Sequence, residues 1–156
     1  MFNIPGPRHY WLKPTAVLAL LSLSVSLHAQ QPIPVSLKGT AEVPPINTSA
    51  SGTGVLTVML DRSVSGSIKI AGFVPTGAHI HEAAIGKNGP AIISLVQSGS
   101  DTFLIPEATR LTVSQYKSYQ AGSLYVNVHS TAYPNGEVRA QLRQLEKMAM
   151  PLRPGY

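Results

Sequence analysis

The sequence contains no cysteine among its 156 residues. This absence excludes a disulfide scaffold, thiolate metal sites, a cysteine nucleophile and a lipid anchor attached through cysteine. Charged residues make up only 12% of the chain, about half the usual share, whereas glycine and proline contribute 13 residues each. Few charges and many turn-forming residues exclude long solvated helices and are typical of all-β domains.

Residues 1–29 have the features of a secretory signal peptide. Arg8 and Lys13 precede an uncharged apolar run at 16–27, and the tripeptide LHA that ends at Ala29 fits a signal-peptidase site. The run is well short of the roughly 20 apolar residues that a membrane-spanning helix needs. We therefore expect cleavage after Ala29 and a secreted or periplasmic protein with no membrane contact after cleavage.

The remaining composition narrows the classes of function. The formal net charge is +5, but the Lys and Arg residues beyond the expected signal are scattered along the chain, so we expect no nucleic-acid partner. The sequence contains no G-x-S-x-G, H-E-x-x-H or P-loop motif. The sequence therefore names no reaction, and whether the protein is an enzyme stays open.

Short apolar or alternating runs, separated by turn signals about every ten residues, predict most of the chain to be strands. We expect strands at 35–38, 54–60, 64–73, 78–82, 91–96, 123–130 and 137–143. Thr112 and Gln115 have the spacing of a capping box, and Gly122 suits a helix end, which predicts one helix at about 112–121. The expected fold is all-β: an antiparallel Greek-key-like β-sandwich with one short helix, spanning 30–145 and followed by a flexible tail at 146–156.

Strict alternation in the last two expected strands assigns side chains to two faces. The apolar residues of these strands are expected to point inward. They are Leu124, Val126, Val128, Val138, Ala140 and Leu142. The polar and aromatic residues between them are expected on the opposite face. They are Tyr125, Asn127, His129, Glu137, Arg139 and Gln141. We expect the residues of the last strand on this second face to point outward to solvent.

Three histidines beyond residue 29 all fall in expected strands. His79 and His81 are two positions apart, so their side chains share a face and their Cα atoms lie about 6–7 Å apart. His129 projects from the polar face of its own strand and supplies a third nitrogen if the strands are neighbours. Three imidazoles without a thiolate suit copper or zinc, with nickel and iron behind, and leave a coordination position open. Of these ions we expect copper, with zinc less favoured.

Several polar residues are candidates to orient these histidines. A metal-binding histidine normally donates its second ring N–H to a carboxylate, carbonyl or amide, and Asn127, Glu137 and Glu82 are close in sequence or share the face. Arg139 follows Glu137 on the same strand face, where it either forms a surface ion pair or attracts anions toward the site.

Three functions remain open on these residues. The first is a metal-binding module, with copper at His79, His81 and His129. The second is a structural or protein-interaction domain in which the histidines only hydrogen-bond to loops, which predicts an exposed apolar patch elsewhere. The third is a copper-dependent redox enzyme, which predicts an open approach lined by positive charge, with Arg139 or Lys87 near its mouth.

Three segments resemble the CHRD domain, first described in chordin and widespread in bacterial exported proteins. They are GTAEVPP at 39–45, HIHEAAIGKNGP at 79–90 and AGSLYVNVHSTAYPNGEVRAQL at 121–142, in the order the family has them. Ala83 and Ala140 replace glycines that are usual in the family. The resemblance implies an extracytoplasmic β-sandwich and leaves the biochemical function open.

A more local resemblance concerns the histidines. GAHIHE at 77–82 is similar to the H-x-H strand of copper/zinc superoxide dismutases, whose two histidines bind copper, and it implies that role for His79 and His81. Those enzymes have a bridging histidine and further zinc-binding histidines downstream, whereas this chain has none before His129. The resemblance therefore implies no zinc subsite.

Overall fold

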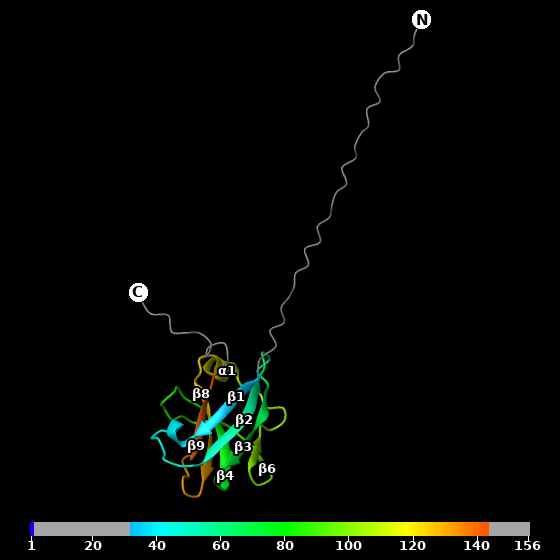
Figure 1. Cartoon of the computed structure of the whole chain (residues 1–156). Coiled ribbons are helices and arrows are strands. Elements are labelled where there is room, and N and C mark those ends of the chain that lie inside the picture. Colours follow the sequence, from blue (N-terminus) through cyan, green and yellow to red (C-terminus); the bar gives the residue numbers. More distant parts are fainter. Residues whose placement is uncertain (2–31, 144–156) are drawn as a thin grey trace.

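The computed structural model describes Met1 and residues 32–143. Its regular structure is mostly antiparallel β-strands, with one short α-helix (Figure 1). Apart from Met1, the expected signal peptide at 1–29 lies outside the described residues, as does the expected tail at 146–156. The helix is too short to cross a membrane, and no other helix of the described part has the length and apolarity to do so.

The described part of the chain contains nine strands, one α-helix and one 3-10 turn, joined by loops. The strands are β1 (Ile33–Lys38), β2 (Ser51–Val58), β3 (Val64–Ala71), β4 (Pro75–Glu82), β5 (Ala91–Ser94), β6 (Val96–Ser98), β7 (Thr102–Leu104), β8 (Leu124–Ser130) and β9 (Val138–Leu142). The 3-10 turn η1 spans Gly39–Ala41 and the helix α1 spans Val113–Gln120.

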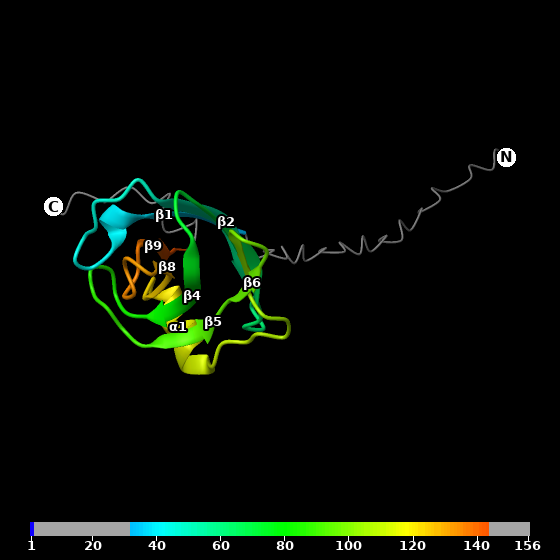
Figure 2. The same ribbon diagram turned by 90° about the horizontal axis from the view of Figure 1, so that it is seen from below.

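All nine strands belong to one sheet in the order β5-β4-β8-β9-β1-β2-β3-β7-β6. The sheet curls around from β1 and β2 on one side to β4 and β5 on the other (Figure 2). Its two edge strands, β5 and β6, are separated in sequence only by Leu95, whose N–H donates to the carbonyl of Ala78. One bent segment thus pairs with β4 through its first half and with β7 through its second half, which nearly closes the sheet.

The inside of the curled sheet holds a single hydrophobic core, because alternate residues of each strand face it. β1 shows this most clearly, since Ile33, Val35 and Leu37 are buried and the residues between them are exposed. In β8 and β9 the core side chains are Leu124, Val126, Val128, Val138, Ala140 and Leu142, as the alternation predicts.

The predicted fold class is confirmed: the chain is all-β and antiparallel with one short helix. The two facing halves of the sandwich belong to one continuous sheet. Several strand ends differ from the expected bounds by up to three residues, and two larger differences concern whole strands. The strand expected at 91–96 is divided at Leu95 into β5 and β6, and β7 was not predicted because three residues are too few to show an alternation.

The helix begins where the sequence predicts it. The side chain of Thr112 accepts a hydrogen bond from the N–H of Gln115, and the side chain of Gln115 accepts one from the N–H of Thr112, so both halves of the capping box are present. Gly122, with φ of 73°, has the left-handed conformation expected just after a helix. Tyr119 anchors the helix in the core, where it is 1% exposed.

We expect Thr112→Ala to lower the free energy of unfolding by about 1 kcal/mol, because an N-cap acceptor for a backbone N–H is lost. Ser114→Ala, at an exposed position of the same helical turn, is the matched control and should change stability by less than about 0.5 kcal/mol. Urea unfolding of both variants measures the difference. Equal stabilities would contradict a stabilising role for the capping box.

Candidate metal centre

The three histidines lie on two paired strands. β4 carries His79 and His81, and β8 carries His129. The two strands are antiparallel neighbours in which His79 pairs with Asn127 and His81 with Tyr125, while His129 lies opposite Gly77. Because these positions all point away from the core, the alternation of both strands brings the imidazoles to one face of the sheet.

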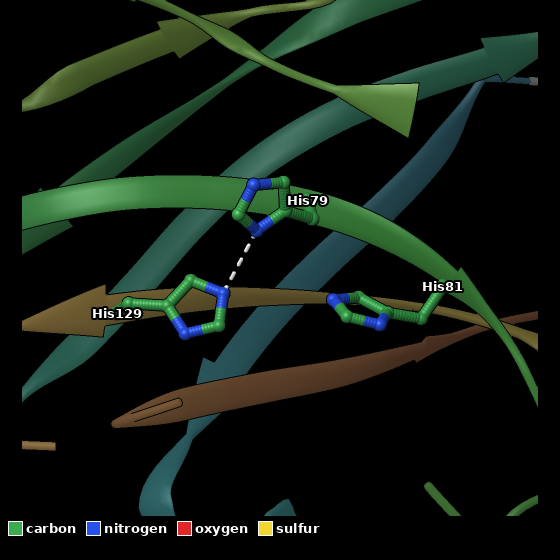
Figure 3. Close-up of side chains that lie close together, drawn as sticks. All are labelled: His79, His81 and His129. Carbon is green, nitrogen blue, oxygen red and sulfur yellow. Dashed lines mark hydrogen bonds between the residues drawn. The ribbon is translucent and has the colours of Figure 1, made fainter. Parts of the chain in front are cut away.

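The three rings converge (Figure 3). Their centroids are 5.7 Å apart for His79 and His81, 4.9 Å for His79 and His129, and 6.4 Å for His81 and His129. One nitrogen from each ring can be chosen so that all three lie within 4.8 Å of one another. A point therefore exists within about 2.8 Å of all three, so shifts of less than about 1 Å give the 2.0–2.1 Å bonds of an imidazole–metal centre.

Backbone carbonyls fix the tautomers of two of the rings. Nδ1 of His81 lies 2.9 Å from the carbonyl oxygen of Gly89, and Nδ1 of His129 lies 3.0 Å from that of Pro134. A carbonyl only accepts, so in both rings Nδ1 carries the proton and the neutral form has its lone pair on Nε2. Nε2 is therefore the nitrogen through which each of these two rings can bind a metal ion.

His79 completes the cluster through a hydrogen bond to His129. Nδ1 of His79 is 2.9 Å from Nε2 of His129 (Figure 3). Since Nε2 of a neutral His129 has no proton, Nδ1–H of His79 is the donor. A metal ion placed between the rings would replace this proton, which moves to the other nitrogen of His79.

One nitrogen of the cluster has no partner. Nε2 of His81 is buried and forms no hydrogen bond. A buried polar atom without a partner is costly, by about 1–3 kcal/mol, and rare in folded proteins. An unpaired lone pair beside two other imidazole nitrogens is the arrangement that a bound cation would satisfy.

Two of the three histidines, His79 and His129, have lowered pKa values, which favours their neutral form. Burial lowers the pKa of His79, and the neighbouring His81 lowers it further. Burial also lowers the pKa of His129, as does His79, while the hydrogen bond to the Pro134 carbonyl opposes the shift. Metal ions bind neutral imidazole, so these shifts favour binding at neutral pH.

The polar face of β8 and β9 is covered, contrary to the sequence expectation. Glu137 and Arg139, which we expected to point outward, are 5% and 1% exposed. Residues 39–50, 83–90 and 131–136 fold over this face and cover a layer of polar side chains, here called the polar layer. It comprises the buried Glu42, Tyr125, Asn127, Glu137 and Arg139 and the half-buried Gln141. Alternation assigns residues to a face but does not reveal a covering loop.

Arg139 holds one of these loops in place. Its guanidinium donates to Oδ1 of Asn88 at 3.0 Å, to the carbonyl of Lys87 at 2.9 Å and to Oε1 of Gln141 at 3.3 Å. The expected surface ion pair of Arg139 with Glu137 is absent among the described residues. Because Arg139 is buried, it does not line an approach to the histidines, and that expectation is corrected.

The residues expected to orient the histidines have other partners. Asn127 donates to the carbonyl of Asn135, Glu137 accepts from the hydroxyl of Thr48, and Glu82 accepts from the hydroxyl of Ser118. Within the described chain, the hydrogen bonds that orient His81 and His129 come from backbone carbonyls instead. The position of a carbonyl depends on how a loop folds, and residue types do not reveal it.

Glu42 is a buried acid that the sequence did not single out as part of this layer. It is 6% exposed, and its Oε1 has no hydrogen-bond partner. Its carboxylate and the amide of Asn127 lie so close to Gly136 that a Cβ at that position would be 2.6 Å from each. Burial raises the pKa of Glu42 to about 7, although Arg139 opposes the shift.

An exposed apolar row crosses the other half of the sheet. Val55 pairs with Ser67, Ser67 with Leu104 and Leu104 with Val96, so these side chains line up across β2, β3, β7 and β6. Val55, Leu104 and Val96 are 47%, 40% and 54% exposed. This row is the kind of surface that the protein-interaction alternative predicts.

The Glu42 carboxyl predicts a pH dependence of stability. Its pKa in the folded protein, about 7, is above the ordinary value of 4.5. The stability that this proton supplies is complete below about pH 4.5, falls as the pH rises and is lost above about pH 7. Glu42→Gln removes this dependence, so the variant should gain up to about 2–3 kcal/mol relative to the parent between pH 4.5 and 8. Urea unfolding across that range measures the difference, and parallel profiles would contradict it.

Comparison with known proteins identifies the family. No curated protein and no solved structure matches the chain. The model of the CHRD domain family matches residues 33–142, which runs from the first residue of β1 to the last of β9 and includes all three histidines and the polar layer. The resemblance of the three sequence segments is thereby confirmed, and the chain belongs to the CHRD domain family.

Proposed function

We propose that this CHRD domain is an extracytoplasmic copper-binding module whose metal ligands are His79, His81 and His129. The observation that carries the proposal is the convergence of three imidazole nitrogens within 4.8 Å of one another. The buried, unpaired Nε2 of His81 supports it, because a cation would satisfy that lone pair.

Copper is favoured over zinc by the ligand set. For divalent ions bound by nitrogen, affinity is highest for Cu²⁺ and lower for Zn²⁺. Structural zinc sites have four protein ligands, whereas the cluster in the described part of the chain has three histidines and no carboxylate or cysteine. Three ligands leave one position for an exogenous group, which suits a protein that takes up and releases copper.

The first test is a copper titration of the metal-free protein. We expect one equivalent of copper to bind, and His79→Ala or His129→Ala should weaken binding at least about 100-fold, more than the 10–100-fold that follows loss of a residue behind a ligand. Affinity is measured by competition with a chromophoric chelator at pH 7.5.

Ser94→Ala provides the control, because Ser94 is exposed and lies directly opposite His79 on β5. It should bind copper like the parent. The decisive variant combines three substitutions, His79→Ala, His81→Ala and His129→Ala. If this triple variant is folded and binds copper like the parent, the site is refuted and the histidines are polar surface residues.

Export is part of the proposal and rests on residues 1–29. When the full chain is produced in a bacterium, we expect the exported protein to begin at Gln30, as read by N-terminal sequencing. Leu20→Arg places a charge in the apolar run and should retain the protein uncleaved in the cytoplasm, whereas Leu20→Val should leave export unchanged. Cytoplasmic accumulation of the parent would contradict export.

A second function is favoured by the exposed apolar row. Val55, Leu104 and Val96 offer a contact surface on the half of the sheet that carries no histidine ligand. The domain would then bind another protein through this row and copper through β4 and β8. The histidine cluster is the more specific of the two features, because a row of three exposed apolar residues is common on sheets.

A further inference from the structure

Three planar groups stack from the candidate metal centre into the polar layer. The ring of His81 stacks on that of Tyr125 with centroids 4.8 Å apart and planes 11° from parallel. Cζ of Arg139 lies 3.4 Å from the centroid of the same tyrosine ring. Because β4 and β9 flank β8 on opposite sides, the imidazole and the guanidinium approach the ring of Tyr125 from opposite faces.

The guanidinium is a buried charge that forms no ion pair with a carboxylate of the described residues. Tyr125 and Arg139 are 2% and 1% exposed, and the hydrogen bonds of Arg139 go to neutral oxygens of Asn88, Lys87 and Gln141. The ion pairs of the described residues lie elsewhere, at Lys69–Asp101 and Arg110–Asp61. Tyr125 has the larger electrostatic effect on Arg139, and Glu42 is the carboxylate whose charge also acts on it. An arginine remains protonated at any physiological pH.

The ligand set also provides no negative charge. The cluster consists of three neutral imidazoles, so no ligand charge offsets the charge of a bound ion. A fixed positive charge nearby repels a divalent ion more than a monovalent one. At a separation of roughly 10 Å and an effective dielectric constant of about 20, one additional unit charge weakens binding about 10-fold.

We infer that the centre binds Cu⁺ in preference to Cu²⁺, and that the buried guanidinium of Arg139, stacked behind Tyr125 and His81, sets this preference. The inference rests on the proposed function, since it specifies the oxidation state of the ion at the same three histidines. Arg139 touches neither the ion nor its ligands and acts only through its charge.

The test compares the affinities for the two oxidation states in the full chain. Cu⁺ affinity is measured without oxygen, with ascorbate present, by competition with bicinchoninate, and Cu²⁺ affinity by competition with glycine. We expect the parent to bind Cu⁺ at least about 10-fold more tightly than Cu²⁺, and Arg139→Met to lower this ratio about 10-fold, chiefly by strengthening Cu²⁺ binding.

Glu42→Gln tests the same electrostatics without removing the loop contacts of Arg139. At pH 8 the carboxyl of Glu42 is ionised, because its pKa is about 7. Its removal leaves Arg139 uncompensated and should raise the ratio of Cu⁺ to Cu²⁺ affinity, opposite to Arg139→Met. This variant decides the inference if Arg139→Met fails to unfold cooperatively.

The outcomes separate the two proposals. Tighter binding of Cu²⁺ than of Cu⁺ by the parent, or an unchanged ratio in Glu42→Gln or in folded Arg139→Met, overturns the inference while copper binding through the histidines stands. Failure of the parent to bind copper in either oxidation state, or binding that survives in the folded triple histidine variant, refutes the proposed function itself.

Discussion

The arrangement of the candidate site depends on one buried interaction, the contact of the Arg139 guanidinium with Tyr125 and with residues 87 and 88. A charge removed from water costs several kcal/mol unless it is well compensated. Here three neutral acceptors and an aromatic face provide the compensation. The guanidinium therefore joins β9 to the loop that follows β4, and it fixes the position of that loop over the sheet.

The position of the loop determines the chemistry of His81. The loop places the carbonyl of Gly89 next to Nδ1 of His81, and the backbone N–H of Gly89 donates to the hydroxyl of Tyr125. The turn between β8 and β9 does the same for His129 through the carbonyl of Pro134. Two separate loops thus orient two rings so that both lone pairs face one point, and the low rotational freedom of the rings reduces the entropy lost on binding an ion.

Membership of the CHRD family accounts for the fold, and the function follows from the residues that this chain places on it. The curled sheet supplies two neighbouring strands with a polar face, and three loops partly cover that face. The covering leaves the histidines only partly exposed while Arg139 and Tyr125 are fully buried. A metal ion at the histidines would therefore lie between solvent and a positively charged interior, which is the basis on which we infer the oxidation-state preference.

The sequence by itself determined the all-β class, the helix and its cap at Thr112, and the common face of His79 and His81, because these depend on local periodicity and spacing. That His129 joins them was decided by the pairing of β4 with β8. The sequence also indicated the family through three segments. It did not determine that Arg139 and Glu137 are buried, that Tyr125 stacks under His81, or that carbonyls of Gly89 and Pro134 orient the rings. Only the tertiary structure decided these points, because loops distant in sequence cover the polar face and alternation along a strand carries no information about what packs on it.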